Sequence, residues 1–116
     1  MLLLYDCGAE AVTPGTPEFE ELVKGYAAFD AELRRRGMQD VPQAPLDAAS
    51  TASTLRIRED RMLITDGPFA ETKEELGGFY LVDCADRDEA LKLAAMIPAA
   101  RYGAVEVRPV REINLD

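Results

Sequence analysis

The sequence has no histidine and no tryptophan among its 116 residues, and it has only two cysteines. Without imidazole, the chain lacks the side chain that most often serves as a general base at neutral pH and as a ligand of zinc or haem iron. Cys7 and Cys84 do not have the spacing of a metal motif, and we expect two reduced, half-buried thiols. The chain also has no glycine-rich phosphate loop and no nucleophile elbow. We therefore expect no metal and no cofactor.

Basic residues are also few, since 13 lysines and arginines stand against 22 acidic residues and the net charge is −9. This balance disfavours direct binding of nucleic acid. The run Arg34–Arg36 is explained by the favourable position of cations at the C-terminus of a helix. No apolar run approaches the roughly 20 residues that cross a bilayer, and the apolar N-terminal run is too short for a signal peptide. We expect a cytoplasmic protein that binds no membrane.

Hydrophobic patterning predicts five strands and two helices in one domain that spans residues 1–116. The predicted strands cover residues 2–5, 54–58, 61–65, 79–84 and 104–108. A helix over 17–36 follows Thr16 as N-cap, and a second helix runs from the capping-box pair Asp86 and Glu89 to Ile97, where Pro98 ends it. The second and third strands form a hairpin because two residues separate them. The segment 38–53, which contains two prolines, is predicted to be irregular.

This element order predicts an α+β fold, a ferredoxin-like sandwich in which two helices cover one face of an antiparallel sheet. The other face of the sheet then carries apolar side chains that need a cover. These side chains are drawn from Leu3, Tyr5, Ile64, Phe79, Leu81, Val105 and Val107. A second copy of the chain would bury this patch, so we expect a homodimer with twofold symmetry. Gly77 and Gly78 suggest a close approach of another backbone.

The segment Asp66–Glu74 is the most distinctive in the chain, because it combines a tight turn, an aromatic residue and three acids. Gly67 permits a left-handed backbone conformation and Pro68 fixes φ, so a strand must end here. We expect Phe69 to be buried and to anchor the loop. Asp66 has two interpretations: its carboxylate bonds the amides of its own turn, or it acts as a general base whose pKa is raised by neighbouring acids.

The candidate site is built around Asp66 as the catalytic acid or base. The candidate ligand-binding residues combine cations, aromatic rings and one further acid, and they are Phe69, Glu71, Lys73, Tyr80, Arg101 and Tyr102. The cations can hold an anionic substrate, and the tyrosines add hydroxyls and flat apolar surface. Ordinary surface ion pairing is the alternative for the charged members. Asp66, Glu71 and Glu74 together could also hold a hard cation, but carboxylates on one loop are a weak signal for it.

Three segments resemble the YCII-related family, in its DGPF-domain branch. They are Asp66–Glu74, then Leu76-Gly77-Gly78-Phe79-Tyr80, and then Pro98–Gly103 with Val105–Val110. The resemblance extends over essentially the whole chain. It implies a dimeric α+β barrel, in which two ferredoxin-like protomers pack sheet to sheet and leave a cleft near the strand ends.

The same resemblance leaves the biochemistry open. One branch of the family acts as a dehydrochlorinase or lyase on chlorinated hydroxyhydroquinones through a histidine and aspartate pair, and this chain lacks the histidine. DGPF-type proteins are also often encoded beside extracytoplasmic-function sigma factors. We therefore expect a protein that binds a small molecule in a cleft near the dimer interface, with lyase-like proton transfer as the reaction that the resemblance implies. The alternative is a non-catalytic dimeric accessory or regulatory module linked to such a sigma factor.

Overall fold

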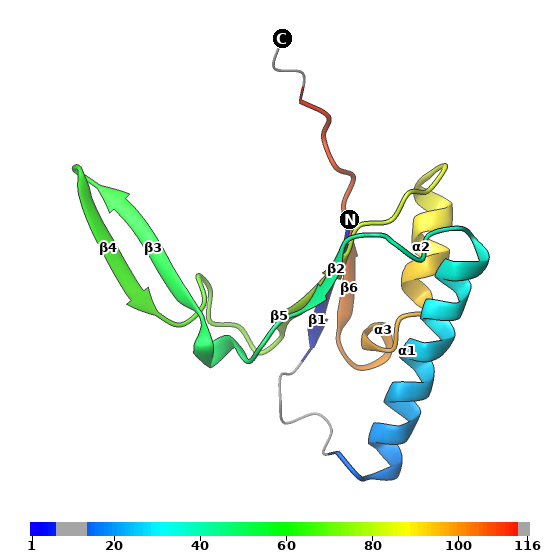
Figure 1. The fold of residues 1–116 in the computed structure, drawn as a ribbon. Coiled ribbons are helices and arrows are strands. Elements are labelled where there is room, and N and C mark those ends of the chain that lie inside the picture. The colour runs from blue at the N-terminus through cyan, green and yellow to red at the C-terminus, as the bar shows by residue number, and fades with distance from the viewer. Residues whose placement is uncertain (7–13, 114–116) are drawn as a thin grey trace.

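Four antiparallel strands form the central sheet, in the order β2-β5-β1-β6. The structure, a computed structural model, describes residues 1–6 and 14–113. The strands are β1 (Leu2–Asp6), β2 (Gln43–Pro45), β5 (Glu75–Tyr80) and β6 (Ala104–Val107). The helices α1 (Pro17–Arg35), α2 (Arg87–Ala95) and α3 (Ala99–Tyr102) lie on one side of this sheet (Figure 1). The chain thus has the predicted α+β, ferredoxin-like architecture, with β1 paired to both β5 and β6.

Local signals place the two long helices almost where they are predicted. The hydroxyl oxygen of Thr16 accepts a hydrogen bond from the amide of Phe19 at 3.3 Å, which caps the start of α1. In α2 the Asp86 carboxylate accepts from the Glu89 amide at 2.8 Å, and the Glu89 carboxylate accepts from the Ala85 amide at 2.9 Å. The helix ends at Ala95, two residues earlier than predicted, and a short turn leads into α3.

The basic end of α1 is tied to acids of both long helices. The guanidinium groups of Arg35 and Arg36 both bind the carboxylate of Glu32, and Arg36 also reaches Glu89 on α2 at 3.3 Å. These hydrogen bonds lower the pKa of Glu32 to about 2. The arginine cluster therefore has a structural role within the chain, in agreement with its interpretation as a feature of the helix terminus.

The core lies between the sheet and the helices. Its largest fully buried side chains are those of Leu2, Phe29, Leu33, Leu93 and Ile97. The rings of Phe29 and Tyr80 meet edge to face, with centroids 4.9 Å apart. Val105 and Val107 pack against this core, so their predicted position on the open face of the sheet is wrong. The strand register explains the position of these two valines. Val105 pairs with Leu4 and Val107 pairs with Leu2, and the side chains of both leucines point toward the helices.

The predicted hairpin is confirmed, but it is not part of the central sheet. β3 (Ser53–Arg58) and β4 (Arg61–Asp66) form a separate two-stranded sheet, which we call the arm. The arm extends away from the central sheet on the side opposite the helices (Figure 1). At its tip Glu59 and Asp60 have φ values of 51° and 63°, as a type I′ turn requires at both central positions.

The fourth strand of the central sheet comes from the segment that is predicted to be irregular. β2 pairs with β5, and its flanks extend the ladder, since the Leu81 amide donates to the Pro42 carbonyl and the Leu46 amide donates to the Gly77 carbonyl, both at 2.8 Å. A strand of three residues that includes a proline has too little periodicity to be found by pattern. A single turn of 3-10 helix, η2 (Ala49–Thr51), then leads into the arm.

The strand predicted over 79–84 lies earlier in the chain, because β5 spans Glu75–Tyr80 and contains both glycines. A Cβ atom at Gly78 would lie 2.9 Å from the carbonyl oxygen of Ala44 on β2. The expected close approach of another backbone is therefore confirmed at this position. The aromatic pair Phe79 and Tyr80 ends the strand rather than beginning it.

Candidate functional site

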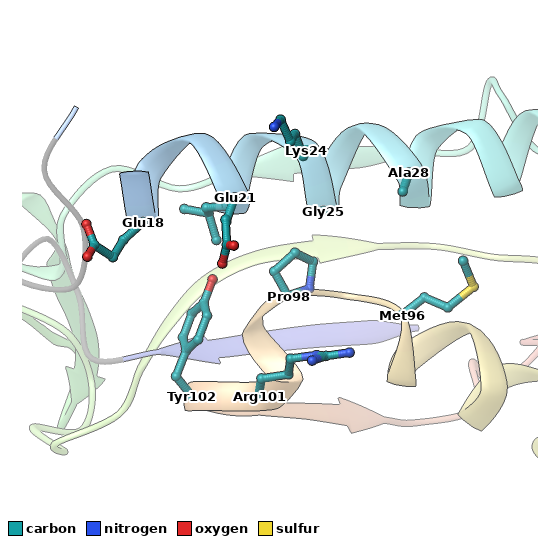
Figure 2. Close-up of a pocket in the computed structure, with 10 residues that line it drawn as sticks. Glu18, Glu21, Lys24, Gly25, Ala28, Met96, Pro98, Arg101 and Tyr102 are labelled. Atoms are coloured by element: carbon teal, nitrogen blue, oxygen red, sulfur yellow. The ribbon is translucent and has the colours of Figure 1, made fainter. Parts of the chain in front are cut away.

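A groove runs between α1 and α3 and has a volume of about 920 Å³ (Figure 2). One wall is the exposed side of α1, which contributes Glu18, Glu21, Leu22, Lys24, Gly25 and Ala28. The other wall consists of Met96, Pro98, Arg101 and Tyr102, which follow α2 or belong to α3. Figure 2 shows the Tyr102 hydroxyl directed toward Glu21, while Lys24 points away from the opposite wall. The groove thus combines an apolar base with a few polar groups, as small-molecule sites do.

Gly25 brings the two walls together. It lies in the interior of α1, where glycine is unfavourable by about 1 kcal/mol relative to alanine. A Cβ atom at this position would lie only 2.7 Å from Cγ of Pro98. The helix therefore crosses the Pro98 turn at a distance that a larger side chain would prevent, and this contact sets the width of the groove.

Gly103 has the same function at the other end of α3. Its Cβ atom would lie 2.0 Å from the carbonyl oxygen of Tyr5 and 3.0 Å from Cα of Asp6. The chain therefore turns from α3 into β6 directly against the end of β1. This turn positions Tyr102 near Asp6, at the edge of the groove.

Three tyrosines have a raised pKa, and one of them, Tyr102, lines the groove. Burial, followed by the proximity of Tyr102, Tyr80 and Asp6, raises the pKa of Tyr26 to about 12. Burial and then Asp30 raise the pKa of Tyr80 to about 12, and burial and then Asp6 raise the pKa of Tyr102. These phenols are protonated near neutral pH, so the Tyr102 hydroxyl is available to a ligand as a hydrogen-bond donor.

The raised tyrosine pKa values predict a loss of stability at alkaline pH. Tyr26 and Tyr80 have a pKa of about 12 in the folded chain against an ordinary value of 10.0, so the folded state retains protons that the unfolded state has lost. Their contribution is complete below about pH 10 and disappears as the pH rises toward 12. We expect the urea midpoint to fall over this interval while absorbance at 295 nm reports phenolate formation. In Tyr80→Phe the fall should be smaller, and an identical fall would contradict the assignment.

The sequence-predicted acid, Asp66, lies at the base of the arm. It is exposed and ends β4, where it pairs with Ser53. The turn after it is held by other groups: the Gly67 amide donates to the Ala52 carbonyl at 2.7 Å, and the Thr54 hydroxyl donates to the Gly67 carbonyl at 2.8 Å. Gly67 has a φ of 100°, as predicted. Within residues 1–6 and 14–113, the Asp66 carboxylate makes no hydrogen bond to the amides of this turn, so the predicted cap is not formed.

The residues that follow Asp66 are also on the surface. Phe69 is 76% exposed, so the prediction that it is buried is wrong for the single chain. Its ring instead receives the guanidinium group of Arg56 on β3, with the guanidinium carbon 5.1 Å from the ring centroid. Glu71 and Lys73 lie on the exposed segment between Phe69 and β5. These residues surround the base of the arm and do not line the groove.

The predicted ligand-binding residues thus fall into three places. Arg101 and Tyr102 line the groove, Tyr80 is in the core against Phe29, and the rest belong to the base of the arm. The groove residues on α1 and the acid Asp6 were missed by sequence reasoning. Two signals pointed to them: a glycine inside an otherwise regular helix, and a carboxylate at the end of a buried strand.

The described residues contain no group of three acidic, cysteine or histidine side chains that could hold a metal ion. Among the same residues, no helix is long and apolar enough to cross a membrane.

Cys84 is half-buried, and burial, followed by Glu89, raises the pKa of its thiol. Cys7 lies outside the described residues.

Comparison with known proteins agrees with the fold. Residues 1–114 match the YCII-related domain. The chain is also similar to the uncharacterized protein R00369 of Rhizobium meliloti (strain 1021), with 49% identity over 95 residues, which cover 80% of this chain and 76% of that protein. The family match covers nearly the full length of the chain, and the sheet order β2-β5-β1-β6 is consistent with it. The chain belongs to the YCII-related family.

Proposed function

We propose that this protein binds a small, mostly apolar molecule with an acidic group in the groove between α1 and α3. The observation that carries the proposal is the apolar base of a groove of about 920 Å³ beside the guanidinium group of Arg101. A guanidinium group binds a carboxylate through charge-assisted hydrogen bonds. The neutral Tyr102 hydroxyl offers a further donor on the same wall.

The opposite wall favours a ligand with a second polar end. Glu18 and Glu21 lie on the α1 side, and Tyr102 faces Glu21 (Figure 2). A carboxylate would be repelled by these acids, so the acidic group belongs at the Arg101 end. A hydroxyl or amine of the ligand fits the Glu21 end, where it would meet an acceptor.

The proposal concerns binding, and a lyase-like reaction is not part of it. Proton transfer at a substrate needs a base within hydrogen-bond reach of the reacting group. Asp66 belongs to the base of the arm and is not among the groove residues, and the chain has no histidine to accompany it. A sigma-factor accessory role draws no support from the groove, whose small size and apolar base suit a metabolite better than a protein.

We include the expected homodimer in this proposal. The register places Leu3, Phe79 and Ala44 side by side across three strands. Leu3 lies between Leu2 and Leu4, and Phe79 precedes Tyr80. Since Leu2, Leu4 and Tyr80 are buried toward the helices, Leu3 and Phe79 lie on the opposite face of the sheet. A second copy would cover this apolar face.

Simple aromatic acids test the groove. We expect benzoate and phenylacetate to raise the melting temperature of the protein and to shift amide resonances of α1 and α3, whereas neutral benzamide does so less. Arg101→Gln should weaken benzoate binding at least about tenfold because it removes a charge-assisted hydrogen bond.

Arg87→Gln on α2 is the matched control, because it removes the same charge from a residue that does not line the groove. Its affinity should equal that of the wild type. Equal binding by the wild type and Arg101→Gln would sink the proposal, and so would resonance shifts confined to the arm. Asp66→Asn in the same titration shows whether the predicted acid affects binding.

A further inference from the structure

The arm has one apolar face and one basic face. Cross-strand pairing sets Leu55 opposite Ile64 and Ile57 opposite Met62, and alternation along each strand puts all four side chains on one face. The other face carries three arginines with two threonines and a leucine, namely Arg56, Arg58, Arg61, Thr54, Thr65 and Leu63. This is the pattern of a sheet with one buried face.

Nothing in the described chain covers the apolar face. Ile57, Met62 and Ile64 are 60%, 63% and 64% exposed, and every residue of β3 and β4 except Thr54 is exposed. A hairpin of two strands is at best marginally stable in water without a surface to pack on. Four adjacent large apolar side chains in water also form a contiguous patch of the kind that marks an interface.

The whole chain exposes more surface than a compact monomer of its mass, and the arm and the extended segment 108–113 both contribute to the excess (Figure 1). Its accessible surface is 8997 Å², whereas a compact monomer of 12.8 kDa exposes about 6,300 Å². The radius of gyration is 16.5 Å against about 13 Å for a compact domain of this length. The excess of about 2,700 Å² exceeds the roughly 800 Å² that each partner buries in an ordinary stable complex.

We infer that the arm is an exchanged dimerisation element, whose apolar face packs on a second copy of this chain. The arm leaves the central sheet on the side opposite the helices, which is the side of the open apolar face (Figure 1). A second copy that covers the open face of the sheet is therefore placed to meet the arm as well, and one interface accounts for both patches. The inference rests on the proposed homodimer and names the segment that holds it.

The base of the arm also leaves apolar surface uncovered. Phe69 stacks on Arg56 there, with the guanidinium carbon 5.1 Å from the ring centroid and the ring 76% exposed. The turn at Gly67 then sets the direction in which the arm reaches its partner.

The test compares two single substitutions on neighbouring residues of β4. Ile64→Asp puts a charge on the apolar face, and Thr65→Asp puts the same charge on the basic face. By light scattering and sedimentation equilibrium we expect the wild type and Thr65→Asp to be dimers, and Ile64→Asp to dissociate at least tenfold more readily. Circular dichroism should show the same helix content in all three, because the arm lies outside the core.

Amide hydrogen exchange provides a second measurement on the unmodified chain. In the dimer we expect the amides of β3 and β4 to be protected, and dilution should reduce this protection while the core amides of β1 and β5 stay protected. Protection of the arm that does not change with concentration would overturn the inference even if Ile64→Asp failed to fold. A dimer that survives Ile64→Asp unchanged would overturn the role of the arm and leave the homodimer, whereas a monomeric wild type would overturn both.

Discussion

Replacing Gly103 by alanine is expected to destabilise the protein by at least about 3 kcal/mol, a large part of the 5–15 kcal/mol that is typical of a domain. The new Cβ atom would lie 2.0 Å from the carbonyl oxygen of Tyr5, which belongs to the central strand β1. A backbone atom cannot move away without displacing the strand that pairs with both β5 and β6. The free energy of unfolding in urea measures the loss.

Gly77→Ala is the matched control, because it also adds one methyl group beside the end of β1. There the new Cβ atom would meet Oδ2 of Asp6 at 3.0 Å, and a carboxylate at the end of a side chain can rotate away. We expect a cost of about 1 kcal/mol or less. Equal losses in the two variants would mean that the close contact at Gly103 does not determine stability. Gly103→Ala should also weaken benzoate binding under conditions where it stays folded, because Gly103 positions Tyr102.

The sequence predicted those features that depend on neighbouring residues. The cap at Thr16, the capping box of Asp86 and Glu89, and the hairpin around Glu59 and Asp60 are local patterns, and the structure contains all of them. The element order predicted the ferredoxin-like architecture, the family resemblance implied the same fold, and the strand order confirms it. By contrast, β2 has three residues and is stabilised by pairing with β5, so no local pattern revealed it.

The errors concern the direction in which side chains face. Phe69 is predicted to be buried and to anchor its loop, yet a loop at the base of a projecting arm has no core to enter, and the ring is exposed. Val105 and Val107 alternate correctly along β6, but alternation alone does not say which of two apolar faces meets the helices. In both cases the missing information is the long-range placement of a strand.

The candidate site was only partly predictable for the same reason. Arg101 and Tyr102 were found because they belong to a recognisable segment, and the groove that they line depends on α1 crossing near Pro98. The contact of Gly25 with Pro98 joins residues more than 70 positions apart in the chain. If the arm packs on a second copy as inferred, the Asp66 segment lies at the dimer contact, and the groove proposed for ligand binding lies on the other side of the sheet, among the helices.

Replacing Leu93 by alanine is expected to cost about 3–5 kcal/mol, since Leu93 is fully buried between α2 and the sheet and its removal leaves a cavity. Leu91→Ala makes the same change two residues earlier on the same helix, where the side chain is 40% exposed, and should cost less than about 1 kcal/mol. Urea denaturation of both variants measures the difference.

The same pair of variants also tests the groove. Because α2 leads directly to Met96 and Pro98 of the groove, Leu93→Ala should also weaken benzoate binding at temperatures where it remains folded, whereas Leu91→Ala should not. Similar losses of stability in the two variants would show that α2 does not anchor the core in the way that its burial indicates.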